Sequence, residues 1–81
     1  VLAQRSGTVA AIDNRRLARV AKLAGAPQAP AAGVELLAHL GQPVMAGDAL
    51  YRIHAEAPGE LAYAADYAAA RPGIITVEVP A

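Results

Sequence analysis

Three features of this 81-residue chain predict an α+β fold with a small β-rich core and two helices. Apolar residues recur at helical spacing between residues 14 and 24, and an alanine-rich stretch at residues 58–70 is long enough for a second helix. Short runs of larger apolar residues bounded by Gly and Pro are typical of strands. A chain of this length holds one domain, since folding units usually have roughly 50 to 200 residues.

The first strand and the first helix are expected at residues 7–12 and 14–24. Asp13 lies between them, where its carboxylate can accept hydrogen bonds from the free N–H groups of the first helical turn. Gly25 and Pro27 follow in the order that usually ends a helix. The apolar stripe expected to face the core has the spacing i, i+3, i+4, i+7 and consists of Leu17, Val20, Ala21 and Ala24.

Two further strands are expected after a Pro-containing loop at residues 26–32. They cover residues 34–40 and 49–55, and the chain between them contains Gly41 and Gly47, whose conformational freedom allows two tight reversals. Side chains alternate between the two faces of a strand. The positions expected to share a face are Val34, Leu36, Ala38 and Leu40 on the first strand, and Tyr51 and Ile53 on the second.

A second helix and a closing strand complete the expected elements. Pro58 suits the first helical position, where its missing N–H is not needed, and the helix should run to Ala70. Pro72 and Gly73 then end it, and residues 74–79 form the last strand. The expected packing stripe of this helix comprises Leu61, Ala64, Ala65 and Ala68.

The composition limits the size of the core and excludes several classes of site. Hydrophobic residues make up 56% of the chain, but 22 of these 45 residues are alanine, so the core is expected to be thin. With no Cys, the chain can form no disulfide, thiolate zinc site or thiol nucleophile. No apolar run approaches the roughly 18 residues that span a bilayer. We therefore expect a cytoplasmic protein with no membrane partner.

Charge is balanced over the whole chain but not along it. The net charge is zero, which disfavours nonspecific binding to nucleic acid or to a membrane surface. Residues 1–40 nevertheless carry five basic and two acidic groups, and residues 41–81 carry two basic and five acidic groups. The basic residues that cluster on one side of the first helix are Arg15, Arg16, Arg19 and Lys22. We interpret this side as a domain-docking face, because no aromatic residue is interleaved to stack on nucleic-acid bases.

No residue of the chain is predicted to be catalytic, to hold a cofactor or to bind a metal. His39 and His54 fall on separate expected strands, and two imidazoles without a third ligand make a poor metal site. Tyr63 and Tyr67 are one helical turn apart and can share a face with Arg71. We interpret these rings as packing at the edge of the core.

Residues 34–55 resemble half of the barrel-sandwich motif of lipoyl and biotinyl carrier domains, with Gly41 and Gly47 between short apolar strands. Such carriers need an acceptor Lys exposed at a hairpin tip. The only Lys of this chain is Lys22, in the middle of the expected first helix. A swinging-arm carrier is therefore not expected, and a barrel-sandwich binding module without an acceptor Lys is the alternative that this motif leaves.

Six segments together resemble the C-terminal domain of the pyrimidine nucleoside phosphorylase family. In order along the chain they are Ser6–Asp13 (SGTVAAID), Leu23–Pro27 (LAGAP), Gly33–Leu36 (GVEL), Leu40–Val44 (LGQPV), Gly47–Glu56 (GDALYRIHAE) and Glu60–Asp66 (ELAYAAD). Their order and spacing carry the resemblance more than any single motif. Within the family, AGAP and YRIHAE are closer to the branch of AMP phosphorylase and archaeal-type thymidine phosphorylase.

The resemblance implies a fold and a reaction. Family members have a helical domain, a large α/β domain that binds phosphate and nucleoside across the intervening cleft, and this third domain, an α/β-hammerhead or barrel-sandwich hybrid. The parent enzyme is then expected to catalyse reversible phosphorolysis of a nucleoside to a free base and ribose or deoxyribose 1-phosphate. Phosphate is its co-substrate, and no cofactor is expected. No catalytic residue of the family has a matching position here.

Residues 1–81 are accordingly expected to be a single C-terminal domain of a longer phosphorylase, structural in role and inactive alone. The first residue, Val1, is not Met, in line with this expectation. The expected partners are the helical and α/β domains of the same chain, with no nucleic acid. The parent is expected to be a homodimer or a higher oligomer.

Overall fold

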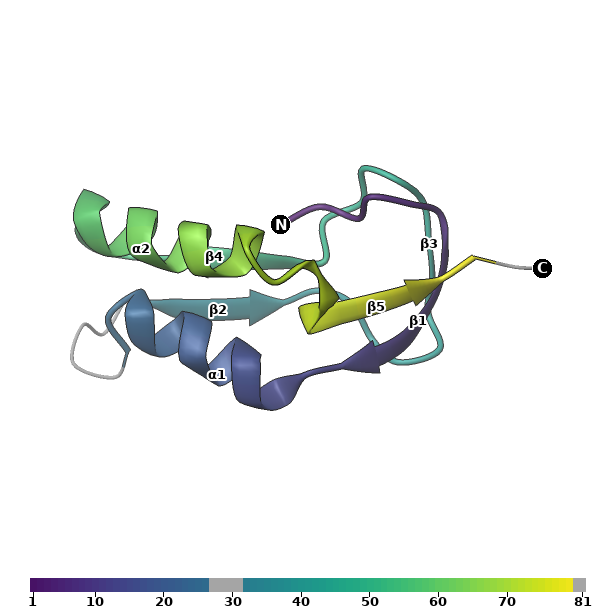
Figure 1. Ribbon diagram of the computed structural model, residues 1–81, viewed down its shortest axis with the longest axis horizontal. Helices are drawn as coiled ribbons and strands as arrows, with labels where there is room; N and C mark the ends of the chain where they lie inside the picture. The colour runs from purple at the N-terminus through teal and green to yellow at the C-terminus, as the bar shows by residue number, and fades with distance from the viewer. Residues whose placement is uncertain (27–31, 80–81) are drawn as a thin grey trace.

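Two helices and two antiparallel sheets make up the described part of the chain, residues 1–26 and 32–79 of a computed structural model (Figure 1). In chain order the elements are β1 (Gly7–Ile12), α1 (Asn14–Leu23), β2 (Gly33–Leu36), β3 (Pro43–Val44), β4 (Tyr51–His54), α2 (Pro58–Ala69), the short 3-10 helix η1 (Pro72–Ile74) and β5 (Ile75–Glu78). This content confirms the α+β prediction.

The strands form one sheet of three strands and one of two. β1 lies between β3 and β5 and is antiparallel to both, while β2 pairs with β4 in the second sheet. The molecule is elongated, 43 × 17 × 17 Å, with the helices and β2–β4 at one end and the three-stranded sheet at the other (Figure 1). The described strands close no barrel, so the hammerhead or barrel-sandwich classification stays a prediction.

The first three residues form a short antiparallel pairing that the sequence did not indicate. Four backbone hydrogen bonds of 2.8–2.9 Å link Val1 and Ala3 to residues 47–51. Between them Leu2 bridges to Ala49. This pairing holds the segment that leads into β4, which therefore does not depend on β2 alone for backbone partners.

Helix α1 forms as its pattern predicts. Its N-cap is Asp13, whose Oδ1 accepts a hydrogen bond of 3.0 Å from the Arg16 backbone N–H. At the other end, two backbone hydrogen bonds close the last turn, from Gly25 N–H to the Lys22 carbonyl and from Ala26 N–H to the Ala21 carbonyl. Pro27 lies outside the described residues. Of the expected apolar stripe, Leu17, Val20 and Ala24 are buried and Ala21 is half-buried.

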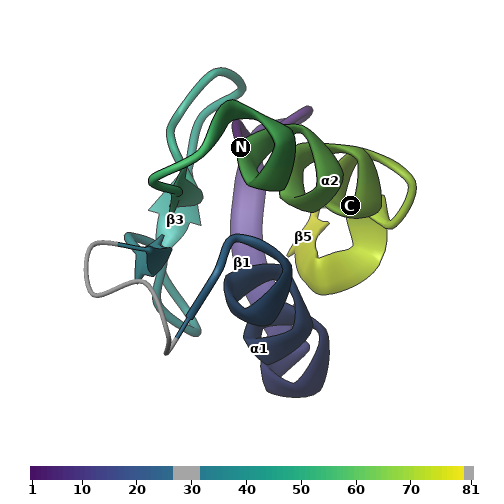
Figure 2. The ribbon, with the colours of Figure 1, turned by 90° about the vertical axis from the view of Figure 1, so that its left-hand side faces the viewer.

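Helix α2 begins at Pro58, as predicted, but its packing stripe differs from the prediction. Ala64 and Ala68 are buried, whereas Leu61 is 43% exposed and Ala65 is also exposed. Apolar residues occur on most sides of the helix, with Leu61 and Tyr63 nearly opposite each other, so its sequence offers little contrast from which the buried side can be chosen. Its neighbours decide instead, because α2 packs against α1 and β4; Figure 2 shows both helices end-on.

The strand predicted at residues 34–40 is shorter than expected, because its partner is short. β2 stops at Leu36, opposite Tyr51 of β4, and the next two N–H groups both donate to the Leu50 carbonyl, at 2.9 and 3.0 Å. The shared face is wrong in part: Ala38 is buried and Val34 half-buried, but Leu36 and Leu40 are exposed. On β4 the predicted alternation is confirmed, with Tyr51 buried and Ile53 half-buried.

The chain between β2 and β4 makes the two predicted reversals. Gly41 and Gly47 adopt positive φ angles of 81° and 94°. Between them, residues expected in a turn, Pro43 and Val44, form β3 and pair with β1. The last strand also differs slightly from the prediction, since η1 takes up its first residue and β5 begins one position later.

The core is thin. Five of the thirteen buried hydrophobic residues are alanine, and no polar or charged side chain is buried within the described residues. The largest of the fully buried side chains is the Tyr51 ring. Burial raises the pKa of the Tyr51 hydroxyl above its usual value, so this side chain stays neutral and acts in packing.

Gly7 lies where β1 comes closest to the end of β5. A Cβ at this position would lie 2.8 Å from the carbonyl carbon of Glu78 and 3.1 Å from Cγ1 of Val77, and nearer still to the Glu78 carbonyl oxygen. Because two of these atoms belong to the backbone, they cannot move without shifting β5. The pairing of the two strands therefore requires glycine here.

We expect Gly7→Ala to lower the free energy of unfolding by about 1–3 kcal/mol, as overpacking does in other proteins. The matched control is Gly59→Ala in the first turn of α2, where an added Cβ meets no atom within 4 Å. Since alanine favours a helix, this variant should be at least as stable as the unsubstituted chain. Urea unfolding followed by circular dichroism measures both, and equal stability of the two variants would contradict the requirement for glycine at position 7.

We expect Asp13→Ala to lower the free energy of unfolding by about 1 kcal/mol, because the Arg16 N–H loses its acceptor. Asp13→Asn is the control: it keeps an acceptor oxygen and loses the charge that pairs with Arg16 Nε at 3.4 Å. It should keep most of the stability, since exposed ion pairs contribute little. The same urea experiment compares them, and an Asn variant as unstable as the Ala variant would assign the effect to charge.

Candidate functional site

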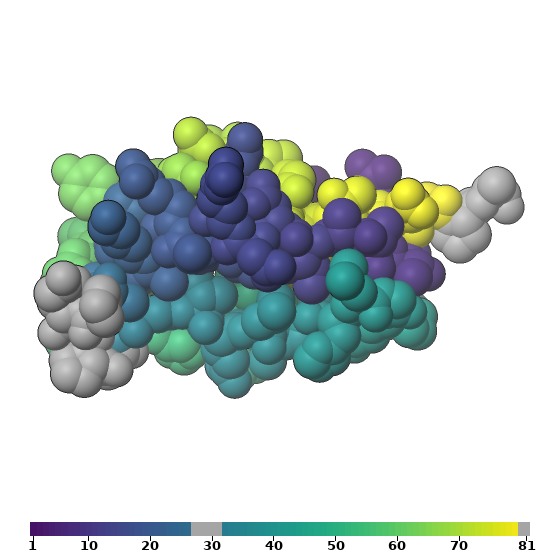
Figure 3. Space-filling view, turned by 90° about the horizontal axis from the view of Figure 1, so that it is seen from below, coloured from purple at the N-terminus to yellow at the C-terminus, as the bar shows by residue number. Residues whose placement is uncertain are grey.

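The four basic residues that the sequence singles out lie on the exposed side of α1. Leu17 and Val20 are buried on the other side, so the helical period turns the four cations toward solvent. All four are exposed: Arg15, Arg16, Arg19 and Lys22. Figure 3 shows α1 (blue) forming much of one surface of the molecule, beside the segment from β2 to β3 (teal).

These cations share a groove with one residue near the end of α2 and one residue just after it. The groove has a volume of about 550 Å³ and is lined by Arg15, Arg16, Ala18, Arg19, Lys22, Tyr67 and Arg71. We call it the α1–α2 groove. The sequence indicated the cations of α1 but not that Tyr67 and Arg71 would form the opposite wall.

Arg71 is held in position by Tyr67. Its Cζ lies 3.9 Å from the centroid of the Tyr67 ring, and its Nη1 donates to the Tyr67 backbone carbonyl over 3.4 Å. The predicted packing of Arg71 on Tyr67 is thus confirmed. Tyr63, which was expected on the same face, is 72% exposed, and within the described residues it forms no such contact.

The α1–α2 groove carries uncompensated positive charge. Among the described residues, one ion pair involves its cations, from Arg16 Nε to Asp13 Oδ2 over 3.4 Å. Arg15 and Arg16 lie in the first turn of α1, at the positive end of the helix dipole, and this turn contains no acidic residue. Arg15 and Arg19 are also like charges at i, i+4, an arrangement that costs about 0.2–0.5 kcal/mol. An anionic partner would relieve both unfavourable terms.

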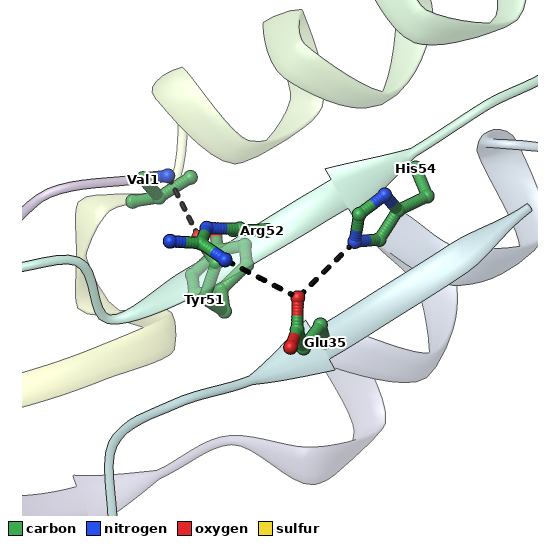
Figure 4. A network of polar contacts seen from close by, with 5 residues as sticks. All are labelled: Val1, Glu35, Tyr51, Arg52 and His54. Atoms are coloured by element: carbon green, nitrogen blue, oxygen red, sulfur yellow. Dashed lines mark hydrogen bonds and ion pairs between the residues drawn. The ribbon is translucent and has the colours of Figure 1, made fainter.

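A second polar cluster lies on the exposed side of the β2–β4 pair (Figure 4). Glu35 of β2 contacts two residues of β4, with its Oε1 3.3 Å from His54 Nε2 and 3.7 Å from Arg52 Nη1. The three side chains are 48–61% exposed. At that exposure such pairs contribute little to stability and have no desolvated position for a substrate. We interpret the cluster as cross-strand pairing.

The two histidines lie in different settings. His54 is on β4 and faces Glu35, whereas His39 follows β2 and belongs to no strand, contrary to the prediction. The His39 backbone N–H donates to the side-chain oxygen of Gln42 over 2.9 Å. Within residues 1–26 and 32–79, no three His, Asp or Glu side chains are grouped so that they could hold a metal ion.

A second groove, of about 290 Å³, runs between residues 1–5 and residues 71–77. Its ionisable side chains are Arg5, Tyr51 and Arg71. Two cations and a phenol whose pKa is raised by burial provide no general acid and base that could work together near neutral pH. Neither of these two grooves therefore brings a general acid and a general base together.

Comparison with known proteins identifies the family. The family model described as Pyrimidine nucleoside phosphorylase C-terminal domain matches residues 8–74. "Putative thymidine phosphorylase 2" of Acidovorax sp. (strain JS42) is 58% identical over 72 residues, which are 89% of this chain and 14% of that protein. A "Putative thymidine phosphorylase" of Sphingopyxis alaskensis is 60% identical over 68 residues, 84% of this chain and 13% of that protein. A protein of the same name from Maricaulis maris (strain MCS10) is 54% identical over 74 residues, which are 91% of this chain and 14% of that protein.

The match to the family model extends from β1 to η1 and so includes both helices and the α1–α2 groove. This chain spans only 13–14% of the length of these three relatives. The resemblance inferred from six short segments is confirmed, and the chain belongs to the pyrimidine nucleoside phosphorylase family, as a C-terminal domain.

Proposed function

We propose that this chain is the C-terminal structural domain of a thymidine phosphorylase or of a closely related pyrimidine nucleoside phosphorylase. The observation that carries the proposal is its 54–60% identity, over 84–91% of its length, to proteins with thymidine phosphorylase in their names. The two grooves support a non-catalytic role, because neither brings an acid and a base together.

In the proposed reaction of the whole enzyme, a phosphate oxygen forms a bond to C1 of the sugar as the bond between C1 and the base nitrogen breaks. The products are a free base and ribose or deoxyribose 1-phosphate. Positive charge develops on the sugar in the transition state, so the enzyme must position phosphate and stabilise the departing base. We assign both tasks to the helical and α/β domains that the family resemblance implies, and neither to residues 1–81.

The proposal includes the setting of the enzyme. Within the described residues no helix has the length and apolar character needed to cross a bilayer. We propose a cytoplasmic homodimer or higher oligomer with phosphate as co-substrate and no resident cofactor, and with neither nucleic acid nor membrane as a partner. The hammerhead or barrel-sandwich classification belongs to the same proposal.

Two other functions are alternatives to this proposal, and they differ from it in the molecule that is bound. The AGAP and YRIHAE segments are closer to the branch of AMP phosphorylase and archaeal-type thymidine phosphorylase, so the first alternative parent is an AMP phosphorylase, which would act on a nucleotide. A barrel-sandwich module that works alone would bind its partner without covalent attachment, because the sole lysine, Lys22, is on α1 and not at a hairpin tip.

We expect the intact protein that carries this domain to release thymine from thymidine when phosphate is present. Thymidine, uridine, cytidine and AMP are tested in parallel, and the free base and the sugar 1-phosphate are measured by chromatography. Sulfate in place of phosphate is the control, because phosphorolysis requires the phosphate oxygen as nucleophile. Turnover of AMP alone would establish the first alternative, and no turnover of any of the four would contradict the proposal.

We also expect the isolated 81-residue chain to show no phosphorolysis of thymidine or AMP. The reason is that neither of its grooves supplies a general acid and base or a closed site for phosphate. The same assay at high chain concentration, beside the intact protein, measures this. Activity that copurifies with the isolated chain through two different columns would overturn the proposed division of labour.

A further inference from the structure

The α1–α2 groove has more positive charge than its own surroundings neutralise. Five cations line it, and among the described residues only Arg16 has a carboxylate partner. Four of the five come from one helix of ten residues. Acidic residues are no rarer than basic ones in the chain, but most of them are in its second half. The groove is therefore a local excess of charge on a neutral domain.

The two walls of the groove present the cations differently. Arg15, Arg19 and Lys22 extend from the exposed side of α1. On the opposite wall Arg71 is fixed on the Tyr67 ring at 3.9 Å and by its bond to the Tyr67 carbonyl. A guanidinium that is already ordered loses less entropy when it binds a carboxylate. This geometry suits a partner that places several carboxylates between the walls.

The chemistry of the groove favours an acidic polypeptide over nucleic acid. Tyr67 is its only aromatic lining residue, and the Arg71 guanidinium lies over that ring. The ring is therefore not free to stack on a base in the way that single-stranded nucleic acid requires. The zero net charge of the chain also provides no long-range attraction for a phosphate backbone.

The remainder of the parent chain is the nearest source of such a polypeptide. This chain spans 13–14% of the relatives cited above, so most of their length lies outside it. A segment tethered to the same chain meets the groove at a high effective concentration, which a free peptide does not. Weak exposed ion pairs can then suffice to hold it.

We infer that the α1–α2 groove receives an acidic segment of the rest of the phosphorylase chain, whose carboxylates pair with Arg15, Arg19, Lys22 and Arg71. The inference rests on the proposed function, because it takes the parent to be a phosphorylase with further domains. It names the chemistry of the partner that the basic side of α1 docks against.

The test is zero-length carbodiimide crosslinking of the intact protein. Lys22 is the sole lysine of the 81 residues, so an amide from its Nζ identifies the carboxylate that the groove holds. We expect mass spectrometry to find Lys22 joined to an Asp or Glu outside these residues. Mixed isotope-labelled and unlabelled protein should show that both ends belong to the same chain. Lys22→Arg, which keeps the charge, should remove this crosslink and no other.

Charge reversal gives a second, independent readout. Arg15→Glu with Arg19→Glu should lower the yield of the Lys22 crosslink about tenfold, as loss of close charge pairs at an interface does. The double variant should leave the isolated 81-residue chain folded. Glutamate at position 15 suits the first turn of a helix better than arginine, and glutamate at the exposed position 19 is a good helix former. Arg15→Lys with Arg19→Lys should keep the crosslink, and so should Arg5→Glu, which changes a cation outside the groove.

Three results would overturn the inference. One is a Lys22 crosslink to residues 1–81 of a second copy, which would make the groove a self-association surface. Another is free acetylation of Lys22 in the intact protein with no crosslink to any carboxylate. The third is protection of Lys22 from acetylation by inorganic phosphate without a crosslink, which would make the groove a small-anion site.

The thymidine assay on the same preparation separates this inference from the proposed function. A same-chain crosslink in a protein that phosphorolyses no nucleoside would support the docking of an acidic segment in the groove and contradict the proposed function. Phosphorolysis without the crosslink would support the proposed function and contradict the docking.

Discussion

The close packing of α2 on α1 is the constraint on which the rest of the domain depends, and it requires small side chains. Both residues that α2 buries are alanines, Ala64 and Ala68, and the buried residue that follows α1 is also an alanine, Ala24. The larger Tyr51 ring reaches the same core from β4. Where the two helices pack, Arg71, two residues after the end of α2, lies beside the cations of α1.

Much of the fold follows from local pattern, and the errors occur where local pattern carries no contrast. α1 has a cap, a full apolar stripe and a glycine after its end, so its bounds and buried side could be predicted. α2 has apolar residues on most sides, so only tertiary contacts decide that Ala64 is buried and Leu61 is not. β2 is short because β4 offers it only four partner residues. The alternation of side chains along one strand does not reveal how long its partner is. The pairing of residues 1–3 was missed for the same reason.

In the candidate site, too, the residues placed by local pattern could be predicted and those placed by tertiary packing could not. Helical spacing was enough to place Arg15, Arg19 and Lys22 on one side of α1, since their positions follow from the helical period alone. Arg71 is separated from them by about 50 positions in sequence, and its place in the groove depends on how α2 crosses α1, about which periodicity says nothing. The contact of Arg71 with Tyr67 was predictable, because the two are one helical turn apart. That this pair forms a wall of the basic groove was not.

The exposure of the charged side chains suits this domain to docking better than to catalysis. Chemistry on a nucleoside needs polar groups taken out of water and fixed in place. Within the described residues no Asp, Glu, His, Lys or Arg side chain is buried, and the Tyr51 phenol, which is buried, packs in the core. Exposed ion pairs contribute little affinity, but complementary charge fixes orientation and excludes wrong arrangements. A tether to the rest of a chain supplies the proximity that weak pairs lack. In the docking that we propose, a cationic groove on a neutral domain is therefore suited to fixing the orientation of the domain on the rest of the chain, while the covalent tether keeps the two together.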